Sequence, residues 1–340
     1  LVIQLLQSEQ KLELGGHSRF LTIFFSDLEA FSTLSEQVPS QELLLRVSAY
    51  LELVTKTVNQ ELGTIDKFIG DGVMAFWGAP ALLEDHAWRA CVAAMRIQRG
   101  MDALNERWRE GGTKPFKIRI GIHSDAVMVG NIGSKERMSY TVMGDGVMAF
   151  WGAPALLEDH AWRACVAALR IQRGIDALNE RWRVEGMKPF KIRIGIHSDA
   201  VMVGNIGSKE RMSYTVMGDG VNIASRLEGI NKEFGTRTCI GHSVFKEAGE
   251  RLCVRPIDDV TVKGRRSKIP IYELLGVFGA DDPELEPDAA TLELCRMTRL
   301  AYEALIKEDH ALASRRYREI LAKFPDDPVS SILAKRLVTA

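Results

Sequence analysis

The sequence predicts an α/β or α+β sandwich, because short apolar runs typical of strands alternate with long amphipathic helices in the order βααββαββ. Apolar residues make up 46% of the 340 residues and charged residues 26%, which are ordinary values for a globular protein with a substantial core. The 44 Lys and Arg balance the 45 Asp and Glu. This balance argues against a protein that binds nucleic acid through a basic surface.

The chain contains a tandem repeat, because the tetrapeptide Gly-Asp-Gly-Val begins at positions 70, 144 and 218. Residues 144–217 match residues 70–143 at 69 of 74 positions. We interpret this as a duplication inside one domain, either natural or introduced during gene assembly. If one copy fills the core, the spare 74 residues are expected to loop out at an exposed loop, at 79–84, 109–114 or 133–137.

Residues 1–17 have apolar positions at helical spacing and end beside a Gly-Gly pair, which predicts a linker helix before the first strand. The chain begins at Leu1 rather than Met, so we expect an upstream sensor or membrane domain outside this sequence. It has no apolar run of about 18 residues and no signal-peptide pattern. The five cysteines form neither a CxxC motif nor a dense disulfide framework, which favours a cytoplasmic location.

The other elements follow from hydrophobic periodicity and turn residues. Up to the end of the first copy we expect a strand at 20–28, a helix at about 40–62, strand–turn–strand at 64–77, a helix at 82–110, two strands within 117–133 and a strand at 138–143. After the second copy we expect a helix at 222–234, a strand and helix start at 236–245, and a hairpin at 255–275. Trp77 and its repeat equivalent Trp151 are both expected in the core.

The composition changes after about residue 276. Residues 276–287 predict a linker, and 288–340 a helical hairpin with amphipathic helices at 288–305 and 309–323. One such pair is similar to a single tetratricopeptide-like unit, although a solenoid needs more repeats. A helical hairpin that docks on the preceding domain is an equally good interpretation.

Asp27 and Asp71 are the first candidates for chemistry. Each follows a short apolar strand, and Asp71 lies between two glycines in a turn. Two carboxylates at the end of a sheet suit Mg²⁺, which prefers oxygen ligands and leaves room for phosphate oxygens. The alternative is a pair of aspartates that serve only the turns.

Five motifs strengthen the first interpretation: FSDLEAFSTLSE, KFIGDGVMAFWG, RIGIHSDAVMVGNIG, YTVMGDGVNIASRLE and VKGRRSKIPIYEL. In order and character they resemble the class III nucleotidyl cyclases, over residues 18–275 with one repeat copy in surplus. The resemblance implies an α+β, ferredoxin-like catalytic domain that forms a head-to-tail homodimer with active sites at the interface. It also implies attack of the ribose 3′-hydroxyl on the α-phosphate, which yields a cyclic nucleotide and pyrophosphate.

The resemblance implies a role for each matching residue. Asp27 and Asp71 are similar to the ligands of two Mg²⁺ or Mn²⁺ ions. Lys67 resembles the lysine that donates to adenine N1, and Thr215 resembles its partner, which accepts from the adenine amino group. ATP is therefore the expected substrate, cyclic AMP the expected product and signal transduction the expected role.

Further residues are implied around the ribose and the phosphates. Asn222 resembles the residue that orients the ribose, and Arg226 the arginine that stabilises charge in the transition state. Lys263 resembles a triphosphate-binding lysine. Arg193 and its repeat equivalent Arg119 are strand arginines of a phosphate region, and one of the two can hold that place. The rival hypothesis is an impaired cyclase-like regulatory or nucleotide-binding module, in which the extra 74 residues disrupt catalysis.

Overall fold

The structure is a computed structural model that describes residues 15–29, 31, 38–133, 138–144, 146–208, 212–261 and 268–339. The chain divides into two compact units: unit 1 is Leu1–Met148 with Val201–Gly218, and unit 2 is Ala149–Ala200 with Asp219–Ala340. We expected one whole copy of the repeat to loop out. Instead both copies contribute folded elements, and the second copy is divided between the two units. The predicted linker helix lies almost entirely outside the described residues.

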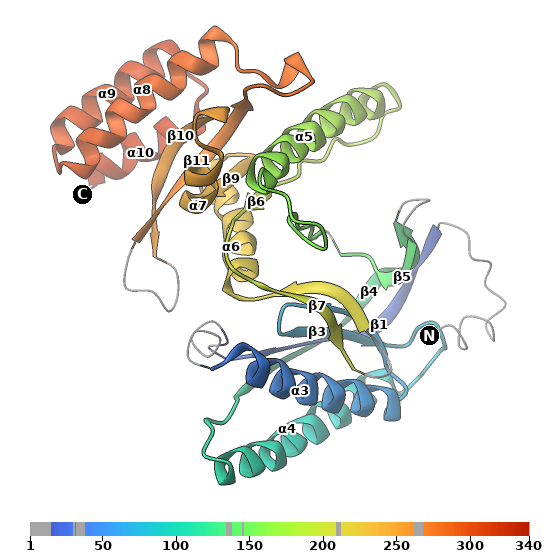
Figure 1. Cartoon of the computed structure of the whole chain (residues 1–340). Helices are drawn as coiled ribbons and strands as arrows, with labels where there is room; N and C mark the ends of the chain where they lie inside the picture. The colour runs from blue at the N-terminus through green and yellow to red at the C-terminus, as the bar shows by residue number, and fades with distance from the viewer. Residues whose placement is uncertain are drawn as a thin grey trace. The chain divides into compact units, whose positions relative to one another are not determined.

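A five-stranded antiparallel sheet in the order β2-β3-β1-β4-β5 forms the centre of unit 1 (Figure 1). Its strands are β1 (Gly15–Leu28), β2 (Thr64–Ile69), β3 (Gly72–Trp77), β4 (Ile118–Gly133) and β5 (Met138–Val142). Helices α3 (Ser40–Gln60) and α4 (His86–Glu110) share one apolar core with this sheet, which includes Phe24, Val54 and Ile97. The antiparallel sheet with flanking helices confirms the predicted α+β class.

Strand β4 is a single strand of 16 residues, where the sequence predicted two. It pairs with β1 along its whole length, from Gly15 opposite Asn131 to Leu28 opposite Ile118. In the second copy the identical residues form two short strands in different sheets, β6 (Ile194–Ile196) and β7 (Met202–Gly207). The cause is the pairing partner, because β1 occurs once in the chain and the first copy occupies it. The backbone groups of the second copy must therefore find hydrogen-bond partners elsewhere.

The hexapeptide Gly-Val-Met-Ala-Phe-Trp also differs between the copies. In the first copy it is β3, paired with both β1 and β2, and Trp77 is fully buried. In the second copy residues 146–151 have no regular secondary structure, and Val147 is 97% exposed. The repeat begins at Gly70, after β2, so the second copy lacks that neighbour. The predicted core position is confirmed for Trp77 and wrong for Trp151, which is 37% exposed.

Replacing each tryptophan by phenylalanine tests this difference with a matched pair. The indole Nε1 of Trp77 donates to the Glu61 carbonyl at 2.9 Å, so Trp77→Phe removes a hydrogen bond and opens a small cavity. We expect the free energy of unfolding to fall by about 1–2 kcal/mol. Trp151→Phe should change it by less than about 0.5 kcal/mol. Urea unfolding measures both, and equal losses would contradict the different packing of the two copies.

The long helix of the repeat buries a different face in each copy. In α4, Ile97 is fully buried and Cys91 is exposed. In α5 (His160–Val184) the pattern is reversed: Ile171, the equivalent of Ile97, is 51% exposed, and Cys165, the equivalent of Cys91, is fully buried. A helix with apolar side chains on more than one face can pack on either of them.

Unit 2 is built on a four-stranded sheet in the order β10-β11-β9-β6, antiparallel except for the β6–β9 pair. Its elements besides α5 and β6 are α6 (Asp219–Phe234), β9 (Thr238–Gly241), α7 (His242–Ala248), the short helices η1 (Gly249–Arg251) and η2 (Pro283–Leu285), β10 (Leu252–Thr261) and β11 (Lys268–Val277). These agree with the predicted helix, strand and hairpin. Strand β8 (Met212–Met217) pairs with β7 in unit 1, where Ile206 and Met217 join the core.

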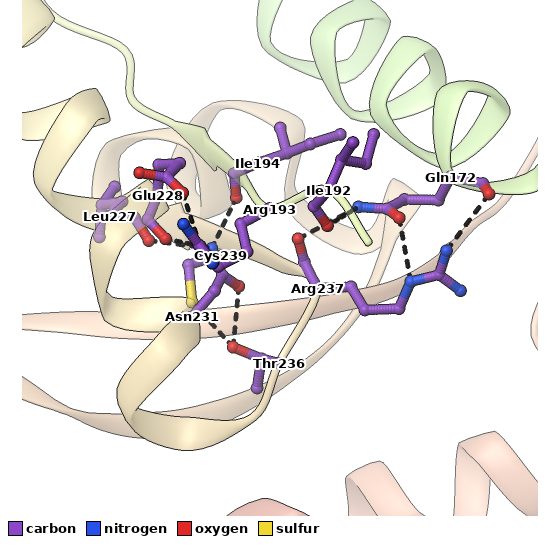
Figure 2. A network of polar contacts seen from close by, with 10 residues as sticks. All are labelled: Gln172, Ile192, Arg193, Ile194, Leu227, Glu228, Asn231, Thr236, Arg237 and Cys239. Carbon is purple, nitrogen blue, oxygen red and sulfur yellow. Dashed lines mark hydrogen bonds and ion pairs between the residues drawn. The ribbon is translucent and has the colours of Figure 1, made fainter. Parts of the chain in front are cut away.

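Helices α5 and α6 hold the second-copy segment around β6 by side-chain hydrogen bonds (Figure 2). The Gln172 amide of α5 donates to the Ile192 carbonyl at 3.3 Å and accepts from Arg237 Nε at 2.9 Å. On α6, the Asn231 amide donates to the Ile194 carbonyl at 3.0 Å. The part of the second copy from α5 to β6 thus belongs to the packed structure of unit 2.

The C-terminal tail has three helices, where the sequence predicted two: α8 (Ala289–Ile306), α9 (His310–Lys323) and α10 (Pro328–Thr339). The sequence predicted no helix after residue 323, but Pro328 occupies the first position of α10, where proline is favourable. The tail shares an apolar core with α6 and the sheet, through residues such as Leu227, Tyr317 and Val329. This packing favours the docking interpretation of the tail. No helix among the described residues is long and apolar enough to cross a membrane.

Candidate active site

Asp27 lies near the end of β1, opposite Arg119 on β4. The two side chains form a bidentate ion pair, in which Arg119 Nε donates to Oδ1 at 2.8 Å and Nη2 to Oδ2 at 2.6 Å. Both side chains are about half exposed, at 45% for Asp27 and 54% for Arg119. The Asp27 carboxylate therefore already binds a cationic group, and both of its oxygens accept hydrogen bonds from the Arg119 guanidinium.

Asp71 occupies the tight turn between β2 and β3, where Gly70 adopts a positive φ of 60°. Its Oδ2 accepts a hydrogen bond from the backbone N–H of Leu28 at 2.9 Å, which ties the turn to the residue after Asp27. The side chain is 6% exposed. Burial raises the pKa of Asp71 to about 6, and the nearby charge of Asp27 acts in the same direction.

The two carboxylates are thus brought together from β1 and the β2–β3 turn, as the sequence predicted. Carboxylate oxygens facing a common edge are suitable ligands for Mg²⁺ or Mn²⁺, which complete their coordination with water and phosphate oxygens. The mutual repulsion of Asp27 and Asp71 would be relieved by such a cation. The two carboxylates are therefore suitable in their chemistry as ligands for a divalent ion.

Lys67 lies on β2, four residues before Asp71, and its Nζ is 3.6 Å from Oδ2 of Asp66. The same carboxylate oxygen accepts from the hydroxyl of Thr141 on β5 at 2.7 Å. Thr141 is the first-copy equivalent of Thr215. Asp66 therefore contacts both Lys67, the lysine expected to bind the base, and Thr141, a threonine of the expected type. The sequence did not indicate these contacts.

Thr215 itself lies on β8, opposite Gly204 of β7, and is 5% exposed. Asn222 and Arg226 lie one helical turn apart on α6, in unit 2. Arg226 lines a cavity of about 620 Å³ together with Asp258 of β10 and Arg336 of α10. The structure thus divides the predicted residues between unit 1 and unit 2.

The two repeat-equivalent arginines have different environments. Arg119 contacts Asp27, as described above, whereas Arg193 precedes β6 in unit 2 and donates from Nε to Glu228 Oε1 of α6 at 2.7 Å (Figure 2). The arginine beside the two aspartates is therefore the first-copy one, rather than the Arg193 expected to bind substrate. Lys263 lies outside the described residues, and so does Asp145, the aspartate of the second Gly-Asp-Gly-Val.

The sequence was compared with known proteins. The family model of the adenylate and guanylate cyclase catalytic domain matches twice, at residues 17–150 and 140–276. The chain belongs to this family. The two matches overlap at the second Gly-Asp-Gly-Val, as expected from a duplication that supplies the middle of the domain twice.

Individual relatives are cyclases by name. The chain is 42% identical to "Adenylate cyclase 1" of Rhizobium meliloti over 137 residues, and this alignment covers 40% of the chain and 21% of the relative. It is 25% identical to "Adenylate cyclase" of Anabaena cylindrica over 276 residues, and that alignment covers 79% of the chain and 39% of the relative. The chain therefore spans well under half the length of these curated relatives.

Solved cyclase structures are also similar. The adenylyl cyclase CyaB from P. aeruginosa is 24% identical, with 81% of this chain and 100% of that chain covered and a TM-score of 0.37. The guanylyl cyclase Cya2 is 23% identical, with 80% and 99% covered and a TM-score of 0.37.

The sequence did not indicate Asp66. It named Thr215 and Arg193 as site residues, whereas the structure places their first-copy equivalents Thr141 and Arg119 beside Asp66 and Asp27. The signal for Asp66 was its position beside Lys67 inside an apolar strand, although an acidic residue is usually exposed to solvent. The choice between copies had no local signal, because Thr141 and Thr215 have identical neighbours on the N-terminal side.

Proposed function

We propose that this cyclase-family chain is an adenylate cyclase catalytic domain, which converts ATP to 3′,5′-cyclic AMP and pyrophosphate in signal transduction. The single observation that carries the proposal is the approach of Asp27 and Asp71, one of them buried, at the edge of the unit 1 sheet. This pair supports binding of the Mg²⁺ or Mn²⁺ ions that a nucleoside triphosphate carries.

Asp27 and Asp71 would hold the divalent ions, which supply charge neutralisation and activation of the ribose 3′-hydroxyl when bound. The guanidinium of Arg119, which holds Asp27 at 2.6–2.8 Å, is placed to exchange this carboxylate for a phosphate oxygen. Arg226 would stabilise negative charge that develops on the α-phosphate, and Asn222 one turn earlier would orient the ribose. Lys263 would bind the triphosphate.

Recognition of adenine follows from the direction of the Thr141 hydroxyl. Its near neighbours, Asp66 Oδ2 at 2.7 Å and the Val142 carbonyl at 3.0 Å, are both acceptors, so the hydroxyl proton points at one of them. A threonine whose proton is engaged offers only lone pairs to a ligand. Lone pairs accept from the amino group of adenine and repel the carbonyl oxygen that guanine carries at that position, while Lys67 would donate to adenine N1.

We propose further that the active form is a homodimer in the cytoplasm, with active sites that combine residues of the two protein chains. Support comes from the family match, because the class III cyclases that the motifs resemble place their active sites at a homodimer interface. The rival function is an impaired nucleotide-binding module, in which the extra 74 residues disrupt catalysis.

A product assay separates these functions. The full chain is incubated with ATP and Mn²⁺, and cyclic AMP is measured beside an Asp71→Ala control. Product above the control is the expected result. A variant lacking residues 144–217 restores a single copy of the repeat, and we expect it to be more soluble and at least as active. Activity in this deletion variant alone would support the impaired module for the full chain, and activity in neither would refute the enzyme.

Selectivity for ATP over GTP tests the base-recognition residues. Replacing Lys67 by glutamate should lower the ATP/GTP ratio of kcat/KM by at least about tenfold, because a donor to adenine N1 becomes an acceptor. Thr141→Ala should lower the same ratio, and Thr215→Ala is its matched control in the other copy. An effect of Thr215→Ala alone would return this role to the second copy, and an unchanged ratio in the Lys67 variant would refute the role of the lysine.

A further inference from the structure

Two buried cysteines meet where the C-terminal tail packs on the unit 2 sheet. Cys253 of β10 and Cys295 of α8 are 42 positions apart in sequence, and their Sγ atoms are 3.5 Å apart. Both thiols are free, and the residues are only 4% and 5% exposed. Nothing in the proposed cyclase mechanism uses either of them.

A cavity of about 260 Å³ reaches both cysteines. Its lining includes Cys253, Cys295 and the side chains of Arg296 and Arg299, with apolar residues such as Leu292 around them. A small neutral oxidant such as hydrogen peroxide occupies little more volume than one water molecule, about 30 Å³. The cavity is therefore large enough to admit it.

The charges around the pair favour a reactive thiolate at Cys253. A hydrogen bond from the Cys295 thiol lowers the pKa of Cys253, and the positive charge of Arg299 acts in the same direction. At the other two buried cysteines burial dominates and raises the pKa of Cys165 and of Cys239 to about 12, although Thr236 hydrogen-bonds to Cys239. Thiolates rather than thiols react with peroxides, so the chain separates one reactive pair from two inert cysteines.

We propose that Cys253 and Cys295 form a redox modification site, at which a peroxide joins the two sulfurs in a reversible disulfide between β10 and α8. The Cys253 thiolate attacks one peroxide oxygen, the O–O bond breaks, and a sulfenic acid and hydroxide result. The hydroxide takes up the proton that the thiol released on ionising and leaves as water. The Cys295 sulfur then attacks the sulfenic sulfur, the S–O bond breaks, and a second water leaves. Two electrons pass from the sulfurs to the peroxide, and a dithiol reductant reverses the change.

The bond needs a small movement, because a disulfide brings its sulfurs to about 2.0 Å. The two sulfurs therefore have to approach by about 1.5 Å from their present separation of 3.5 Å. Once formed, the bond would close a loop that contains β11 and the linker before α8, and so fasten the tail covalently to the sheet. A disulfide that closes a loop of this length stabilises the folded state, because it restricts the conformations of the unfolded chain.

The test is peptide mapping of the full chain after treatment with about one equivalent of hydrogen peroxide and alkylation of the remaining thiols. Trypsin places Cys253 on residues 252–263 and Cys295 on residues 269–296, because the bond before Pro256 resists cleavage. We expect these two peptides to be linked, and dithiothreitol to separate them. Cys165 and Cys239 should stay reduced, and exposed Cys91 reports how much oxidant reached the surface.

Thermal unfolding gives a second measurement. Oxidation should raise the Tm by roughly 5–10 °C. Cys295→Ser should remove this gain and leave a sulfenic acid at Cys253 that dimedone traps, whereas Cys91→Ser should leave the gain intact. Oxidation of Cys91 while Cys253 and Cys295 remain reduced in the wild-type chain would overturn the proposal, and this result does not depend on the folding of any variant or on cyclase activity.

Discussion

Replacing Asp71 by asparagine is expected to abolish cyclase activity and, at the same time, to stabilise the fold at neutral pH. The side chain is 6% exposed, and burial raises its pKa to about 6. Asparagine removes the buried charge but keeps an oxygen that can accept from the Leu28 N–H. Activity should fall by at least about 1000-fold, because a neutral amide is a poor ligand for a divalent ion whose charge neutralisation is worth several kcal/mol.

The sign of the stability change depends on pH. A carboxyl whose pKa is higher in the folded than in the unfolded chain stabilises the fold below the unfolded pKa, near 4, and this contribution is lost as the pH rises through about 6. Asp71→Asn should therefore resemble the wild type at pH 4 and exceed it above pH 6, by about 3 kcal/mol in the free energy of unfolding.

Urea unfolding at several pH values, without divalent ions, measures this difference. Asp27→Asn is the control, because the Asp27 side chain is 45% exposed and paired with Arg119. It should also lose activity, but without a gain in stability. If Asp71→Asn is less stable than the wild type at pH 7.5, the carboxylate is held by contacts that outweigh its burial, and desolvation is not what controls its pKa.

Local pattern was sufficient for the elements that carry Lys67 and Asp71. The sequence of an apolar strand, a Gly-Asp-Gly turn and a second apolar strand predicts a β-hairpin. Strands β2 and β3 form this hairpin. Helices α3, α4, α6, α8 and α9 and the terminal hairpin were likewise predictable from periodicity, whereas α10 was not predicted. Asp27 could be placed at the same edge because it follows the apolar run of β1, which pairs with β3.

The choice between repeat copies was not predictable, because the deciding information lies outside the repeat. Strands β1 and β2 occur once, so one copy of the repeated strands completes the sheet and the other does not. Arg119 thereby faces Asp27, and Arg193, with the same neighbours in sequence, faces Glu228. Pairing partners, rather than intrinsic preference, decide what a strand-forming segment becomes.

Replacing Arg255 by methionine is expected to destabilise unit 2 by about 3–5 kcal/mol. The guanidinium of Arg255 on β10 lies between two carboxylates, with Nη2 2.6 Å from Glu273 of β11 and Nη1 2.7 Å from Asp327 before α10. The three side chains are 3%, 9% and 5% exposed. Methionine fills the space but leaves the buried carboxylates of Glu273 and Asp327 without a cation. These two carboxylates then repel each other, which weakens the packing of the tail on the sheet.

Arg336→Met provides the control, since Arg336 also joins the tail to β10, through Asp258 at 2.7 Å, but is 48% exposed. Its loss should cost no more than about 1 kcal/mol. Burial already raises the pKa of Glu273, and without Arg255 the pKa of Glu273 should rise further. The deficit of Arg255→Met should therefore shrink as the pH falls toward 4, where the Glu273 carboxyl is protonated. A deficit of the same size at pH 4 and pH 7.5 would mean that Arg255 acts through packing rather than charge, because a cavity or a strained side chain does not titrate.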